Sequence, residues 1–131
     1  MKVIVTGAAG FIGSHVSKAL LAQGHDVVGI DNINSYYDPR LKHARLAWLT
    51  PYKGFSLTQA DIADREAMFR LADAHSDAGS IIHLAAQAGV RHSLIDPFTY
   101  ADSNVMGQVV IFEMAKRLKH CSNLVYASSS S

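Results

Sequence analysis

Three glycines lie in the part of the chain best suited to chemistry. Gly7, Gly10 and Gly13 are spaced by threes, directly after the apolar run 3–5 and before an amphipathic segment. A strand that turns sharply into a helix needs a permissive residue, room for an approaching anion, and a small residue where helix and strand pack. The unpaired amides and positive dipole end of the helix face that anion. This context predicts a dinucleotide pyrophosphate site rather than a plain strand-to-helix turn.

A carboxylate supplies the second half of this signature. Asp31 follows the strand-like run 27–30 and stands eighteen residues after Gly13. A carboxylate at the tip of the second strand can hold a ribose diol, and it would repel a 2′-phosphate. We therefore expect NAD rather than NADP. The alternative is that Asp31 only begins a turn with Asn32.

Length and composition exclude several classes of protein. The chain has 131 residues, an apolar fraction of 49%, 12 Lys plus Arg against 11 Asp plus Glu, and a single cysteine, Cys121. One domain with an ample core is expected, without a disulfide, and the absence of a leader pattern favours a cytoplasmic location. No basic stripe suggests nucleic acid, and no apolar run is long enough for a membrane span. The histidines lack metal-ligand spacing, so no metal site is predicted.

Strand-like and helical patterns alternate along the chain, which predicts an α/β fold with a parallel sheet. The strand-like runs are 3–5, 27–30, 55–59, 81–84 and 124–126. The first helix is expected to carry an apolar repeat at helical spacing, formed by Ile12, Val16, Ala19 and Leu20, and to end at Gly24. Later helices are expected at 39–49, after a cap at Asp64, and at about 104–119. Right-handed crossovers give a Rossmann-like, doubly wound three-layer αβα order 3-2-1-4-5, in which ligands gather between strands one and four.

Six segments in order resemble extended short-chain dehydrogenase/reductases of the NAD-dependent nucleotide-sugar epimerase/dehydratase family. They are residues 6–13, 31–32, 59–62, 81–86, 102–104 and 124–131. Two further stretches, 31–42 and 85–93, are most similar to UDP-glucuronate 4-epimerases. The resemblance implies that residues 1–131 form the N-terminal NAD-binding Rossmann domain. It also implies that the domain is truncated after about the fifth strand and that the C-terminal substrate domain is absent from this chain.

The resemblance also implies which residues bind the cofactor. The positions it assigns to NAD are Gly7, Gly10, Phe11, Ile12, Gly13, Asp31, Asn32, Asp61, Ile62, Leu84, Ala85, Ala86, Gln87 and Asn104. Three of these assignments have structural alternatives. Asp61 could belong to the cap before the third helix, residues 84–87 could simply pack against the first helix, and Asn104 could be a helix N-cap that needs no ligand.

The chemistry implied by the resemblance is transient oxidation at sugar C4, in which NAD⁺ takes a hydride and returns it to the other face of a 4-keto intermediate. The family's base is the tyrosine of a Tyr-x-x-x-Lys helix, assisted by a serine after the fifth strand. Ser129 is the best match to that serine, with Ser128 and Ser130 as competitors on the substrate side. The alternative is that these serines form only a polar tail. None of the tyrosines has a lysine four residues later. We therefore expect this chain alone to be inactive.

Two further residues could contribute to the site. Arg91 follows the fourth strand, where a guanidinium could pair with a hexuronate carboxylate or a phosphate, or with a structural acid. His83 lies within the fourth strand and is expected to be a core histidine.

The favoured reading is the NAD-binding part of a 4-epimerase acting on UDP-glucuronate and UDP-galacturonate, with a UDP-sugar as substrate partner and a homodimeric parent. A dimer could form through Val105, Val109, Phe112 and Ala115 of the last helix, although ordinary core packing would also suit these residues. UDP-glucose 4-epimerisation and nucleotide-sugar 4,6-dehydration are close alternatives. A non-catalytic dinucleotide-sensing module is the alternative from another class.

Overall fold

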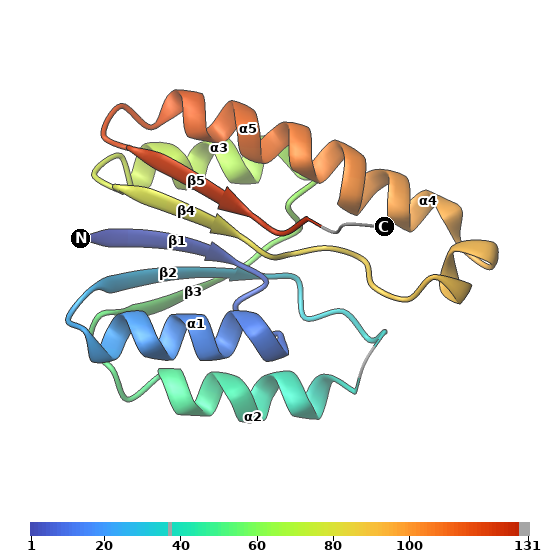
Figure 1. Cartoon of the computed structure of the whole chain (residues 1–131), viewed down its shortest axis with the longest axis horizontal. Helices are drawn as coiled ribbons and strands as arrows, with labels where there is room; N and C mark the ends of the chain where they lie inside the picture. Colours follow the sequence, from blue (N-terminus) through green and yellow to red (C-terminus); the bar gives the residue numbers. More distant parts are fainter. Residues whose placement is uncertain (37, 129–131) are drawn as a thin grey trace.

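A parallel sheet of five strands forms the centre of the protein. The computed structural model describes residues 1–36 and 38–128. The strands are β1 (Lys2–Thr6), β2 (Asp26–Asp31), β3 (Phe55–Gln59), β4 (Ser80–His83) and β5 (Asn123–Tyr126). Their order is β3-β2-β1-β4-β5, with every neighbouring pair parallel, as the alternating sequence pattern predicts (Figure 1).

Helices cover both faces of this sheet. The helices α1 (Phe11–Ala22) and α2 (Pro39–Leu49) lie together below the sheet in Figure 1, and α3 (Arg65–Ala74) and α5 (Gly107–Arg117) lie together above it. Each parallel strand must be joined to the next by a crossover, and the helices in these crossovers bury both sheet faces. The result is the predicted three-layer αβα architecture.

The side chains of β1 alternate between two cores. Ile4 belongs to the core under α3 and α5, with Met68 and Met114. Val3 and Val5 belong to the core under α1 and α2. Because both faces are covered, Val3, Ile4 and Val5 are all buried, which explains why the strand reads as a continuous apolar run.

Side-chain caps fix the start of two helices. The Asp38 carboxylate accepts a hydrogen bond from the Arg40 amide at the start of α2, and the Asp64 carboxylate accepts one from the Ala67 amide at the start of α3. Gly24 has φ +90° just after α1, where a left-handed residue ends the helix. The predicted cap at Asp64 and the predicted stop at Gly24 are both confirmed.

The predicted buried face of α1 is wrong. Ile12 is 62% exposed, whereas the buried residues of α1 are Gly13, Ser14, Ser17 and Leu21. The helix begins so close to the loop after β1 that a Cβ on Gly13 would lie 1.9 Å from the Gly7 carbonyl oxygen. Small side chains therefore face inward over the first turns of α1, and the large apolar side chains that pack on the core, Leu20 and Leu21, lie near the end of the helix.

The last helical region begins earlier than predicted. A 3₁₀ turn, η1 (Arg91–Leu94), precedes one continuous helical run made of α4 (Pro97–Tyr100), a π-helical segment η2 (Ala101–Met106) and α5. The Asp96 carboxylate caps this run by accepting a hydrogen bond from the Thr99 amide, and Pro97 occupies the first turn. Asn104 therefore lies inside the run, and the alternative that it is a helix N-cap is wrong.

Core packing explains only some of the apolar residues of this helical run. Val105, Val109 and Phe112 are exposed, while Val110, Ile111 and Met114 are buried against the sheet. The alternative of core packing is therefore wrong for Val105, Val109 and Phe112.

Across residues 1–36 and 38–128, no helix has the length and apolar character that a bilayer crossing requires.

Candidate dinucleotide site

A cavity of about 550 Å³ opens at the carboxyl ends of the central strands. Its walls come from the loops after β1, β2, β3 and β4, together with α1 and α2. The lining residues are Gly7, Gly10, Phe11, Ile12, Gly13, Ile30, Asp31, Asn32, Asn34, Tyr36, Leu41, Lys42, Arg45, Ala60, Asp61, Ile62, Leu84, Ala85, Ala86, Gln87, Ala88, Ser103 and Ala127. In an open α/β sheet, ligands bind at this edge, where the strand order reverses between β1 and β4.

The glycine loop is shaped by two close backbone approaches. Gly7 has φ +72°, and a Cβ there would lie 2.9 Å from the Ala85 amide nitrogen. Its own amide donates to the Ile30 carbonyl at 2.8 Å. A side chain at Gly13 would strike the Gly7 carbonyl. Each of these glycines therefore brings two segments of backbone into contact, as the phosphate-loop interpretation requires.

Asp31 lies at the end of β2 with its carboxylate in the wall of the cavity. One oxygen, Oδ2, accepts a hydrogen bond from the Ala9 amide at 3.0 Å. The other, Oδ1, accepts hydrogen bonds from the Ile33 amide at 2.8 Å and from Lys42 Nζ at 3.1 Å. The side chain thus forms the turn considered from sequence and also lines the cavity, so the two readings of Asp31 are compatible.

A hydroxyl joins the end of β1 to the end of β4. Thr6 Oγ1 lies 2.6 Å from His83 Nδ1 and accepts hydrogen bonds from the Leu84 and Ala85 amides, both at 3.0 Å. Because the two amides use both lone pairs, the single hydroxyl proton must be donated to His83 Nδ1. This assigns the imidazole proton to Nε2. Burial lowers the pKa of His83 to about 4, so the ring is neutral at pH 7, and its predicted place in the core is confirmed.

Asn104 contacts the protein backbone instead of facing the cavity. Its Oδ1 accepts a hydrogen bond from the Gln87 amide at 2.8 Å, and its Nδ2 donates to the Gln87 carbonyl at 3.2 Å. The π-helical segment η2 presents the side chain in this position. Asn104 therefore clamps the wall formed by residues 84–88, and the lining residue contributed by the same segment is Ser103.

The acid predicted after the third strand lines the cavity. Asp61 and Ile62 both line the wall after β3. Asp61 Oδ1 accepts a hydrogen bond from the Ala63 amide at 2.9 Å, which forms the turn that leads into α3. Residues 84–87 all line the cavity, and the backbone of Leu84 and Ala85 also packs against Gly7.

Of the predicted substrate-side residues, the two that the structure describes, Arg91 and Ser128, are not part of the cavity wall. Arg91 is exposed in η1 and is absent from the cavity wall, and among the described residues it has no carboxylate within ion-pair distance. Ser128 is exposed and follows Ala127, which does line the wall. Ser129 and Ser130 lie outside the described residues.

Sequence reasoning missed six wall residues from the β2–α2 loop, from α2 and from η2. These are Asn34, Tyr36, Leu41, Lys42, Arg45 and Ser103. Lys42 and Arg45 are three residues apart on α2, so they share a helix face. That spacing, soon after the Asp38 cap, was the sequence signal that could have identified Lys42 and Arg45 as neighbours on one face of a helix. What it could not show is that α2 packs beside α1, which turns this face towards Asp31.

The residues present fit a dinucleotide. The loop beside the α1 N-terminus is free of side chains at the glycines, where a Cβ on Gly10 would already lie 3.1 Å from the Gly7 oxygen. A pyrophosphate can approach such a surface and accept hydrogen bonds from helix amides. Two carboxylates lie further along the same wall, the buried one of Asp31 and the exposed one of Asp61. Each could accept a hydrogen bond from a hydroxyl or amine group of a dinucleotide.

Comparison with known proteins agrees with this assignment. The model of the NAD dependent epimerase/dehydratase family matches residues 3–131. UDP-glucuronate 4-epimerase 1 of Arabidopsis thaliana is 45% identical over 131 residues, covering 100% of this chain and 30% of that protein. The chain thus spans less than half the length of the curated relatives it matches.

Two solved structures share the fold. The first is UDP-glucuronic acid 4-epimerase from Bacillus cereus in complex with UDP-glucuronic acid and NAD; it superposes with a TM-score of 0.89 at 35% identity, over 100% of this chain and 41% of that one. The second is UDP-glucose 4-epimerase from Thermotoga maritima with UDP-glucose, which gives a TM-score of 0.83 at 31% identity, over 98% and 38% of the two chains.

Proposed function

The chain belongs to the NAD dependent epimerase/dehydratase family, and we propose that it is the NAD-binding part of a UDP-glucuronate 4-epimerase. The observation that carries the proposal is the cavity beside β1. Its wall combines the glycine loop, Asp31 after β2 and Asp61 after β3, which are the groups that a dinucleotide needs in that spatial order.

Each part of the wall has a proposed role. Gly10 and the first amides of α1 hold the pyrophosphate, Asp31 with Asn32 holds the adenosine ribose, and Asp61 accepts a hydrogen bond from the adenine amine. Residues 84–87 form the wall along the cofactor, held in place by Asn104. Bound NAD supplies a hydride acceptor for the sugar C4. Ser128, Ser129, Ser130 and Arg91 are proposed for the substrate side.

The sugar specificity is supported by the relatives that the chain matches. Proteins named UDP-glucuronate 4-epimerase are 44–46% identical to it. The second candidate substrate is UDP-glucose, favoured by the likeness to the Thermotoga maritima structure.

The five tyrosines at positions 36, 37, 52, 100 and 126 each lack a lysine four residues later. For this reason, the purified chain is expected to bind NAD without converting UDP-glucuronate, and measurable turnover by the chain alone would contradict that expectation.

Titration calorimetry with NAD⁺ tests the site directly. Gly10→Ala places a Cβ in the phosphate loop and is expected to weaken NAD⁺ binding at least about tenfold, because the pyrophosphate and the new methyl group compete for one space. Gly79→Ala is the control. Its Cβ meets only the flexible Met1 side chain, away from the cavity, so its affinity should match that of the wild type. Equal affinities of the wild type and Gly10→Ala would overturn the proposed pyrophosphate position.

A further inference from the structure

A buried ion pair stands at the ribose end of the cavity. Lys42 Nζ lies 3.1 Å from Asp31 Oδ1, and the two side chains are 11% and 5% exposed. Both residues line the cavity wall. A buried carboxylate that loses the cation it is paired with is left with an unpaired charge, so the electrostatics of Asp31 depend on Lys42. The pair is therefore part of the binding surface as well as of the fold.

Hydrogen-bonding capacity at this end is unevenly divided. The Asp31 carboxylate can accept about four hydrogen bonds and already receives three, from Ala9, Ile33 and Lys42. An ammonium carries three N–H donors, and Lys42 directs one of them to Asp31. Arg45, also in the wall, places Nη1 3.4 Å from the Ala9 carbonyl. The hydrogen-bonding groups that remain available at this end are therefore mostly N–H donors of cations.

Charge at this end follows the same pattern. Among the described residues, the cavity wall contains two carboxylates, Asp31 and Asp61, and two cations, Lys42 and Arg45. Lys42 pairs with Asp31, and Arg45 contacts the carbonyl of Ala9, whose amide donates to Asp31. Asp61 accepts a hydrogen bond from the Ala63 amide of its own loop. Taken alone, Asp31 predicts strong rejection of a 2′-phosphate, and a cation paired with it reduces that repulsion.

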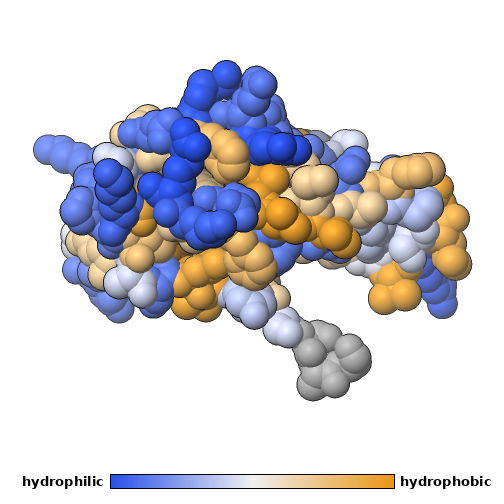
Figure 2. Space-filling model, turned by 90° about the horizontal axis from the view of Figure 1, so that it is seen from above, coloured by the Kyte–Doolittle hydropathy of each residue, from blue (hydrophilic) through white to orange (hydrophobic). Residues whose placement is uncertain are grey.

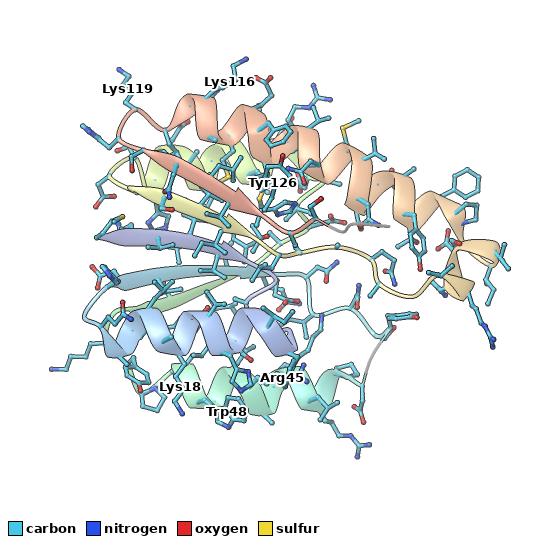
Figure 3. The ribbon with its side chains drawn as sticks, viewed as in Figure 1. Lys18, Arg45, Trp48, Lys116, Lys119 and Tyr126 are labelled. Carbon is cyan, nitrogen blue, oxygen red and sulfur yellow. The ribbon has the colours of Figure 1, made fainter. Side chains whose placement is uncertain are left out.

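A ladder of aromatic and cationic side chains holds α2 in this position. The Arg45 guanidinium lies 5.9 Å from the Phe11 ring centroid, Phe11 and His15 are 5.0 Å apart, and His15 and Trp48 are 5.5 Å apart. Lys18 Nζ lies 5.8 Å from the Trp48 ring. Figure 3 shows the labelled members of this ladder along the surface where α1 and α2 meet. The contacts join α2 to α1, and Arg45 cannot turn away from the cavity without breaking its contact with Phe11.

We propose that Lys42 is a specificity-determining residue of the dinucleotide site. It orients the Asp31 carboxylate towards the ribose diol, and together with Arg45 it reduces the repulsion that Asp31 exerts on a 2′-phosphate. Discrimination between NAD⁺ and NADP⁺ is then set by the Asp31–Lys42 pair instead of by Asp31 alone. This inference rests on the proposed function, because it takes the ribose end of the cavity as the place where the adenosine ribose binds.

The test is the ratio of the dissociation constants for NADP⁺ and NAD⁺, measured by titration calorimetry on the 131-residue chain. Lys42→Met keeps the length of the side chain and removes the charge. We expect it to weaken NAD⁺ about tenfold and NADP⁺ about a hundredfold, because the 2′-phosphate then meets an uncompensated carboxylate. Asp31→Asn leaves both cations in place and should lower the ratio at least about tenfold. Lys42→Arg keeps the charge and should leave the ratio within about threefold of the wild type.

Arg40→Met is the matched control. Arg40 is on the same helix, but its side chain is 90% exposed and pairs with Asp38 outside the cavity wall, so the ratio should not change. A merely structural role for Lys42 would weaken both dinucleotides equally, and an unchanged ratio in Lys42→Met would overturn the inference. If Lys42→Met does not fold, an Asp31→Asn ratio equal to that of the wild type would overturn it in the same way. Failure of the wild type to bind either dinucleotide would instead overturn the proposed function.

Discussion

The cavity wall near α2 and the segment that follows β4 are built differently. In the wall, the carboxylate of Asp31 is held by hydrogen bonds from the Ala9 and Ile33 amides and from Lys42. After β4, the chain instead carries apolar side chains on the surface: Val90, Leu94, Ile95 and Phe98 are 88%, 87%, 80% and 77% exposed. Figure 2 shows hydrophobic atoms on the projecting lobe where Figure 1 places α4.

Around Asp31, polar groups find hydrogen-bond partners within the protein. After β4, apolar side chains lie on a surface that the described part of the chain leaves uncovered. A contiguous exposed apolar region is typical of a contact surface. The ribose end should therefore be sensitive to single atoms, and the surface after β4 should tolerate large changes when the chain is studied alone. Three measurements would break or sharpen the contrast.

The largest effect is expected at Gly13. Helix propensity alone predicts that Gly13→Ala stabilises the protein by about 1 kcal/mol. The new Cβ, however, would lie 1.9 Å from the Gly7 carbonyl oxygen, where the neighbour is backbone and cannot rotate away. The clash should dominate, with a loss of about 3 kcal/mol in the free energy of unfolding by urea. Gly54→Ala is the control, since the atom closest to its Cβ belongs to the exposed Asp26 side chain, which can move, and the nearest backbone atom, the His25 carbonyl oxygen, lies 3.3 Å away. A stabilised Gly13→Ala would show that the glycine loop is less rigid than described.

An intermediate effect is expected from pH, through His83. Its pKa is lowered from 6.5 to about 4 by burial, so between these values the unfolded chain binds a proton that the folded chain does not. Stability from this group is therefore complete above pH 6.5 and is lost as the pH falls towards 4. Urea titrations of the wild type and His83→Gln across this range should show a shallower decline in the variant. Parallel declines would mean that His83 takes up its proton in the folded state.

The smallest effect is expected in the apolar segment after β4. Leu94→Ser changes a side chain that is 87% exposed and should alter the free energy of unfolding by no more than about 0.5 kcal/mol. Leu49→Ala, at a fully buried leucine of α2, should cost about 2–5 kcal/mol. If Leu94→Ser were as damaging as Leu49→Ala, the segment would be packed in solution and the contrast between the two regions would fail.

Much of the fold could be predicted because local signals and tertiary packing agree. The apolar runs, the Asp64 cap and Gly24 marked strands and helix ends that the structure contains. The buried face of α1 was not predictable from apolar periodicity, because close packing on the Gly7 loop favours small residues over large ones. The start of the last helical run was also missed, although Asp96 and Pro97 form a typical N-terminal signal.

The sequence by itself determined the glycine loop, the acid at the end of β2 and the alternation of strands and helices, because each depends on residues close together in the chain. Only the tertiary structure decided which groups share the cavity. Lys42 reaches Asp31 because α2 packs on α1, and Asn104 reaches Gln87 because η2 crosses the loop after β4. Such pairings depend on the relative placement of whole elements, which no local periodicity encodes.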